Sequence, residues 1–139
     1  MEVMFRSSGN VLITLLRGDI DHHTASALRH TIDQSMKEFG CSNLVMDFSG
    51  VGFMDSAGIG VVLGRYKKMM KSGGRICISG CSPHVARLLE MAGVFSLVQQ
   101  ADTQRQAESM LQSAPQMTGE SGGSTAAGVS GRFGTRIFP

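Results

Sequence analysis

The sequence has no long apolar run, few cysteines and little excess charge, and each scarcity narrows the possible functions. No stretch of about 18 apolar residues occurs, so we expect no membrane span. The formal net charge of +2 is too small to indicate a nucleic-acid or membrane surface. Cys41, Cys77 and Cys81 form neither an even disulfide framework nor a C-x-x-C pair, which indicates reduced thiols and a cytoplasmic location. The first residues lack the pattern of a secretory signal.

The composition divides the chain into two parts. Residues 1–112 carry apolar periodicity, and their length suffices for one domain with its own core. Residues 113–139 are rich in Gly, Ser and Ala, show no periodicity, and cannot offset ordering entropy by burial. We therefore predict a single domain over 1–112 and a flexible tail over 113–139. The tail has a few apolar residues at 133–138. They either have no structural role or dock on the domain.

Strands and helices alternate through the predicted domain. A hairpin of strands 2–6 and 11–17 comes first, because Ser-Gly-Asn between them is typical of turns. The spacing of apolar residues, with Gly and Pro at the element ends, predicts the remaining elements. Helices are expected over 25–39, 58–71, 83–92 and 102–111, the last capped by Asp102. Strands are expected over 44–48 and 75–78, and an edge strand over 95–98. The fold class is α/β, with a mixed, mostly parallel sheet and an antiparallel N-terminal hairpin at its edge.

Ser56 is the residue that points most directly to a function. It lies in the loop Phe53-Met54-Asp55-Ser56-Ala57-Gly58, between an apolar strand and the first turn of a helix. Free backbone N–H groups and the helix dipole favour negative charge at such a position. A phosphate on Ser56 is therefore compatible with the helix. We predict that Ser56 is phosphorylated, and that the protein is modified by an enzyme rather than being one.

Three glycines raise the alternative of a small nucleotide-binding enzyme. Gly58, Gly60 and Gly64 follow a strand and open a helix, as in dinucleotide-binding folds. Their spacing is one residue too long, no acidic residue stands about 20 positions later, and the P-loop lysine is absent. Close packing of helix on sheet explains the glycines better. We expect no cofactor.

Metal and hydrolase chemistry have even less support. Asp21-His22-His23-Thr24 and His30 offer possible metal ligands, but neighbouring histidines point in different directions and a fourth ligand is missing. Helix capping by Asp21 or Thr24 explains this stretch without a metal. A nucleophilic Ser56 would need a base and an oriented partner, and the loop is not G-x-S-x-G. We expect neither a metal site nor a catalytic residue.

Two further features concern possible partners. Arg65, Lys67, Lys68 and Lys71 form a basic patch on the helix after Ser56, which is either a solvated helix face or a guide for an acidic partner. Most of the ten methionines fill the core, whereas Met54, beside the loop, is a candidate exposed contact.

Several stretches together resemble the STAS family. They are Gly18-Asp19-Ile20-Asp21-His22-His23-Thr24-Ala25, Phe53 to Val61 with its D-S-x-G loop, Leu63-Gly64-Arg65-Tyr66-Lys67, and Gly73-Gly74. Within the family, they are most similar to the sporulation-type anti-sigma-factor antagonists of spore-forming bacteria. The resemblance spans roughly residues 3–112 in the same order of elements. Relatives often have a second serine where this chain has Ala57, and the segment after Ser113 is not part of the family pattern.

The resemblance implies a partner-switching cycle. The unmodified antagonist would bind an anti-sigma factor that is also an ATP-bound serine kinase, and so release the sigma factor. The kinase would then phosphorylate Ser56 and end the complex, and a metal-dependent serine phosphatase would restore the antagonist. The residues expected at the partner surface are Asp21, His22, Met54, Asp55, Ser56, Ala57, Gly58, Ile59 and Arg65. A STAS-fold stress-signalling scaffold phosphorylated by a different kinase is the alternative.

Overall fold

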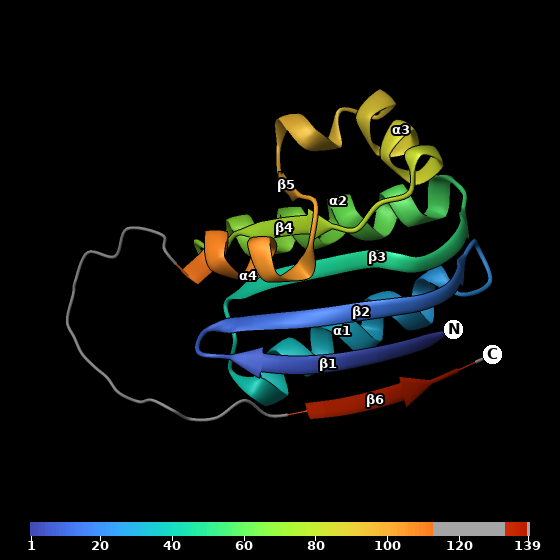
Figure 1. The fold of residues 1–139 in the computed structure, drawn as a ribbon. Coiled ribbons are helices and arrows are strands. Elements are labelled where there is room, and N and C mark those ends of the chain that lie inside the picture. The colour runs from blue at the N-terminus through green and yellow to red at the C-terminus, as the bar shows by residue number, and fades with distance from the viewer. Residues whose placement is uncertain (113–132, 139) are drawn as a thin grey trace.

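The computed structural model describes residues 1–112 and 133–138, which form one six-stranded mixed sheet with helices on both faces (Figure 1). The strand order is β5-β4-β3-β2-β1-β6. The strands are β1 (Glu2–Ser8), β2 (Val11–Ile20), β3 (Asn43–Met54), β4 (Ile76–Ser79), β5 (Gln99–Ala101) and β6 (Phe133–Ile137). The helices are α1 (Ala25–Phe39), α2 (Ser56–Met70), α3 (Pro83–Met91) and α4 (Gln104–Gln112), with a 3-10 turn η1 (Val94–Ser96).

The pairing of the strands confirms the predicted fold class. β2, β3, β4 and β5 are joined by parallel pairs, whereas β1 pairs antiparallel with β2 and so forms the expected N-terminal hairpin. The parallel part follows from the connections, because each pair of neighbouring parallel strands is joined through a helix.

Two apolar cores lie on the two faces of the sheet. Buried residues of α1, α2 and α3, among them Leu28, Val62 and Leu89, pack on one face. On the other face, Ala107 and Leu111 of α4 cover Val45 and its neighbours. Central strands covered on both sides are apolar at nearly every position, which is why β3 and β4 stand out in the sequence.

The segment predicted as an edge strand over 95–98 is different in the structure. Gly93 adopts the left-handed conformation, η1 follows it, and the N–H of Val98 donates to the carbonyl of Val94 at 3.0 Å. The edge strand comes one turn later, as β5. The prediction was wrong because Val94 and Val98 are buried four residues apart, and a short apolar run does not distinguish that spacing from a strand.

The predicted flexible tail is also wrong in part. Phe133–Ile137 form β6, which pairs antiparallel with β1 along its outer edge, and the ring of Phe5 lies against Gly134. Arg136 forms an ion pair with Glu38 of α1 at 3.4 Å. Without β6, β1 would be an edge strand with unpaired backbone groups, and composition alone does not reveal such an edge. Residues 113–132 and 139 lie outside the described residues, and the boundary at 112 stays a prediction.

Candidate functional site

The long pairing of β2 with β3 brings two loops together. The two strands run parallel to their last residues, where Ile20 is the register partner of Met54, after register shifts near Leu15 and Gly18. The N–H of Asp55 donates to the carbonyl of Ile20 at 3.1 Å. The loop after β2, which begins at Asp21, therefore lies beside the loop that carries Ser56. Both loops were predicted to contribute to one surface, and the structure places them side by side.

Ser56 is the first residue of α2, and its side chain is exposed. The carboxylate of Asp55 caps the helix by accepting a hydrogen bond from the N–H of Ala57 at 2.8 Å. The sequence predicted a helix start two residues later, at Gly58. The earlier start places the Ser56 hydroxyl directly at the positive end of the helix dipole, where a phosphate is favoured.

Asp21 organises the neighbouring loop. Its carboxylate accepts hydrogen bonds from the N–H groups of His23 at 2.9 Å and Thr24 at 3.1 Å. The bond from His23 is the main reason why the pKa of Asp21 lies below its ordinary value of 3.8. The predicted side-chain cap of α1 by Asp21 or Thr24 is wrong: Thr24 is the N-cap residue and its side chain makes no cap bond, while the Asp21 carboxylate holds the turn that precedes the helix. His22 and His23 are exposed, and their ring centroids lie 3.9 Å apart.

The turn at Asp21 predicts a pH-dependent effect on stability. At neutral pH, Asp21→Ala is expected to lower the melting temperature, because two N–H groups lose an acceptor. The folded pKa of Asp21 is lowered, so its carboxylate contributes fully above the ordinary value of 3.8, and this contribution is lost as the pH falls through the folded pKa. The difference in melting temperature between wild type and Asp21→Ala should therefore shrink in acid. Asp21→Asn, which keeps an acceptor, is the matched control, and an effect of Asp21→Ala that is constant down to pH 2 would contradict the assignment.

The expected exposed contact at Met54 is wrong. Its side chain is 1% exposed and packs against the backbone at Gly58, where an added Cβ would collide with the Met54 side chain and approach Ile20. The buried contact of Met54 with Gly58 thus supports the Ser56 loop from the interior of the protein. Ala57 and Ile59 are half-buried. Phe53, which was not among the predicted contact residues, is 47% exposed beside Met54. Strand alternation carried the signal, because a buried Met54 places Phe53 on the opposite face.

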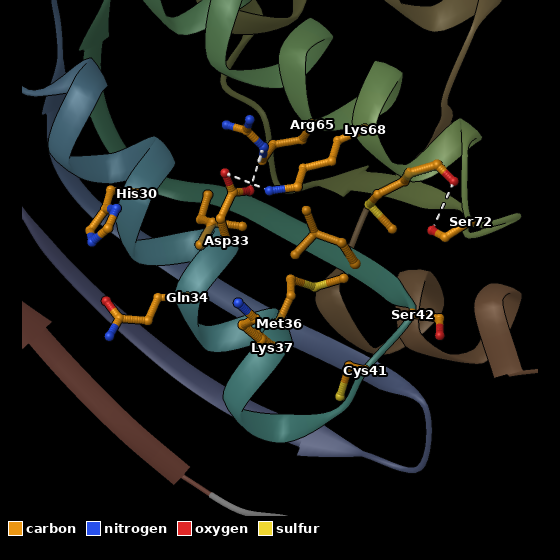
Figure 2. A pocket seen from close by; sticks show the side chains of 13 residues that line it. His30, Asp33, Gln34, Met36, Lys37, Cys41, Ser42, Arg65, Lys68 and Ser72 are labelled. Carbon is orange, nitrogen blue, oxygen red and sulfur yellow. Dashed lines mark hydrogen bonds and ion pairs between the residues drawn. The ribbon is translucent and has the colours of Figure 1, made fainter.

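Arg65 does not lie on an exposed basic face. Its side chain is 8% exposed and lies between α1 and α2, with Nε 2.8 Å from a carboxylate oxygen of Asp33 (Figure 2). Lys68 approaches the other oxygen of Asp33 at 3.3 Å. Burial lowers the pKa of the Arg65 guanidinium, against the opposing effect of Asp33. Arg65 therefore joins two helices, and the predicted contact of Arg65 with a partner does not fit its burial.

A cavity of about 630 Å³ adjoins this ion pair. It lies between α1, α2 and the start of β3, and Figure 2 shows Met36, Lys37 and Cys41 on the side opposite Arg65 and Lys68. The cavity is distant from the Ser56 loop along α2, since its lining residues belong to the second half of that helix. We assign it no role in the function of the loop.

The three glycines of α2 do not share one role. Gly58 is the site of close packing predicted from the sequence, whereas a Cβ on Gly60 or Gly64 would meet no atom within 4 Å. The packing interpretation therefore holds for Gly58 alone.

Other chemistry is not assembled in the described part of the chain. Residues 1–112 and 133–138 contain no group of three or more His, Cys, Asp or Glu side chains that could hold a metal ion. Burial raises the pKa values of the Cys77 and Cys81 thiols to about 11, so neither favours the reactive thiolate. Among the helices of this same part, none is long and apolar enough to cross a membrane.

Comparisons with known proteins point to one family. The sequence profile of the STAS domain family matches residues 2–107. An anti-sigma F factor antagonist of Paenibacillus polymyxa is 36% identical over 98 residues, which are 70% of this chain and 84% of that protein. An anti-sigma-B factor antagonist of Bacillus subtilis is 28% identical over 98 residues, 70% of this chain and 88% of the relative. The solved structure of the antagonist SpoIIAA in its unphosphorylated form superposes with a TM-score of 0.67 at 25% identity, covering 78% of this chain and 94% of SpoIIAA.

Proposed function

The chain belongs to the STAS domain family, and from this premise we propose that it is an anti-sigma-factor antagonist switched by phosphorylation of Ser56. In the unmodified state it binds an anti-sigma factor and thereby releases a sigma factor. It acts by binding rather than by catalysis. The observation that carries this proposal is the exposed Ser56 hydroxyl at the start of α2, capped by Asp55 and lying beside the Asp21 loop.

The surface proposed to contact the anti-sigma factor is smaller than the sequence indicated. Met54 and Gly58 are buried and support the site from within, whereas Arg65 is buried in the second half of α2, where it joins that helix to α1. The accessible part, which we call the switch surface, consists of Asp21, His22, Phe53, Asp55, Ser56, Ala57 and Ile59. It combines the aromatic side chain of Phe53 with the carboxylates of Asp21 and Asp55. Such a composition suits a protein interface, in which burial of apolar surface gives affinity and charge gives specificity.

A phosphate on Ser56 would act locally. It adds about −1.5 to −2 of charge at neutral pH. The dipole of α2 tolerates that charge, so the fold should persist. The neighbouring carboxylates of Asp21 and Asp55 give the phosphate no cationic partner, and the added charge therefore opposes burial of the switch surface against another protein.

The proposed cycle needs two enzymes. The anti-sigma factor would itself be an ATP-dependent serine kinase, which modifies Ser56 within the complex. A metal-dependent serine phosphatase would remove the phosphate and restore binding. Such a cycle belongs in the cytoplasm, where ATP is available. Neither nucleic acid nor a membrane takes part directly.

A sigma-release assay tests the proposal. A labelled sigma factor is bound to its anti-sigma factor, the unmodified chain is added, and fluorescence anisotropy reports free sigma factor. The wild-type chain should release the sigma factor. Phe53→Asp, which places a charge on an exposed apolar residue of the switch surface, should raise the concentration needed for release at least tenfold.

Lys71→Ala is the matched control for this assay, because Lys71 is exposed at the opposite end of α2. It should release the sigma factor as wild type does. Equal activity of Phe53→Asp and wild type would show that binding occurs elsewhere on the molecule. Normal phosphorylation by an unrelated kinase, together with no release of any sigma factor, would favour a STAS-fold signalling scaffold.

A further inference from the structure

The C-terminal strand β6 lies outside the part of the chain that matches the family. The family match ends at residue 107, whereas β6 spans Phe133–Ile137. β6 covers the outer edge of β1 through five register pairs, from Glu2 with Ile137 to Arg6 with Phe133. Among the described residues it is the last strand at this side of the sheet, and in Figure 1 it forms the red lower edge. β6 thus pairs with the outer side of β1 and itself becomes the edge strand of the sheet on this side.

The backbone groups on the new edge can be assigned from the ladder. Met1 and Phe138 exchange both hydrogen bonds, with N···O distances of 2.8 and 2.9 Å. In an antiparallel pair, hydrogen-bonded residues alternate with residues whose N–H and C=O groups point away from the partner strand. Because Phe138 bonds to Met1, the groups of Arg136 and Gly134 also face β1. Those of Phe133, Thr135 and Ile137 therefore face outward.

Two of these three residues, Phe133 and Ile137, have large apolar side chains that are exposed. Phe133 is 74% exposed and Ile137 is 76% exposed. Gly134 lies against the rings of Phe5 and Phe39, on the face covered by α1, so Phe133 and Ile137 project from the opposite face. A strand that presents free backbone groups together with exposed large apolar side chains favours pairing with another strand.

The sequence of β6 is complementary to itself. We propose that β6 pairs antiparallel with β6 of a second copy of this chain, in a two-fold arrangement centred on Thr135. Phe133 then lies opposite Ile137 of the second copy, and Thr135 lies opposite its counterpart. These are the residues whose N–H and C=O groups face outward, so these pairs are the hydrogen-bonded ones, and the pairs of Gly134 with Arg136 between them are not. Pairs of an aromatic with a β-branched side chain also stabilise antiparallel strands.

The charges of β6 allow this register. Arg136 is the one charged residue of the strand, and it would lie opposite Gly134 of the second copy rather than opposite another arginine. Its guanidinium is already directed to Glu38 on the α1 face. A two-fold axis makes the interface isologous and closed, so pairing stops at the dimer.

The dimer would leave the switch surface free. β1 and β2 stand between β6 and β3, the strand that leads into the Ser56 loop. Each dimer would therefore present two Ser56 loops. The inference does not depend on the proposed function, because it rests on β6 alone.

Sedimentation velocity on the full chain tests the proposal, over concentrations from about 5 to about 500 µM. Wild type should change from monomer to dimer within this range. Thr135→Pro removes an outward N–H and leaves the bonds to β1 in place, so it should raise the dimer dissociation constant at least tenfold. Its amide spectrum should still show the β1–β6 pairing, which separates loss of the dimer from loss of the strand.

A charge-exchange pair tests the register. The double variant F133K/I137K places lysine opposite lysine and should be monomeric. The double variant F133E/I137K places glutamate opposite lysine at both ends and should dimerise again, with a dissociation constant that increases with salt. A wild-type chain that stays monomeric at the highest concentration would overturn the proposal, and so would a dimer that both lysine and proline variants leave unchanged.

Discussion

Phosphorylation of Ser56 is expected to weaken binding to the anti-sigma factor about a thousandfold, which corresponds to about 4 kcal/mol. The reason is local. Ser56 is exposed at the start of α2, and the adjacent loop from Asp21 to Thr24 contains a carboxylate and no lysine or arginine. Burying a phosphate dianion against a partner without a compensating charge costs several kcal/mol. Isothermal titration calorimetry with the unmodified and the phosphorylated chain measures the difference.

Three variants make this result specific. Ser56→Ala should bind as the unmodified chain does and resist the kinase. Ser56→Asp should weaken binding by less than phosphate does, because a carboxylate carries less charge. Ser72→Ala, just beyond the opposite end of α2, should affect neither binding nor phosphorylation. If the phosphorylated chain bound within threefold of the unmodified one, the electrostatic account would be wrong. Amide shifts spread through the sheet on phosphorylation would instead indicate refolding.

Gly58→Ala is expected to destabilise the fold by about 1 to 3 kcal/mol, the usual range for overpacking a filled core. A Cβ at Gly58 would collide with the Met54 side chain and approach Ile20. Met54 is 1% exposed and has little room to yield. Because α2 begins two residues earlier, the collision should also displace Ser56. Urea unfolding measures the stability, and the rate of phosphorylation reports the position of the hydroxyl.

Gly60→Ala is the matched control for that prediction. Gly60 lies in the same helix, and its Cβ would meet nothing within 4 Å. Alanine is favoured over glycine within a helix by about 0.5 to 1 kcal/mol, so this variant should be more stable than wild type. Opposite signs for the two substitutions would establish that Gly58 alone is needed for close packing. Two changes of the same sign would contradict the packing at Met54.

The features predicted well from the sequence are those with a local cause. The stop of α1 at Gly40 and the proline start of α3 follow from short-range backbone chemistry, and the alternation of strands and helices gave the mixed sheet. The proximity of Asp21 to the Ser56 loop came from the family resemblance. Its physical basis is that neighbouring parallel strands end at the same edge of the sheet, here at Ile20 and Met54.

The features predicted poorly depend on tertiary contacts. Arg65 looked exposed because it lies off the apolar stripe of α2, but Asp33 of α1 draws it into the interface. The burial of Met54 also depends on a tertiary contact. The strand predicted over 44–48 continues as β3 to Met54, where it still pairs with Ile20 at the end of β2. β6 pairs with β1 across most of the chain length, and composition near residue 133 carries no sign of that partner.

The most direct test of the central claim is intact-mass analysis after incubation of the chain with its anti-sigma factor kinase and ATP, followed by peptide mapping. The account predicts a single added phosphate, located on Ser56 and absent from the Ser56→Ala variant. A phosphate on another residue, or none at all, would contradict the claim that the exposed hydroxyl at the start of α2 is the switch.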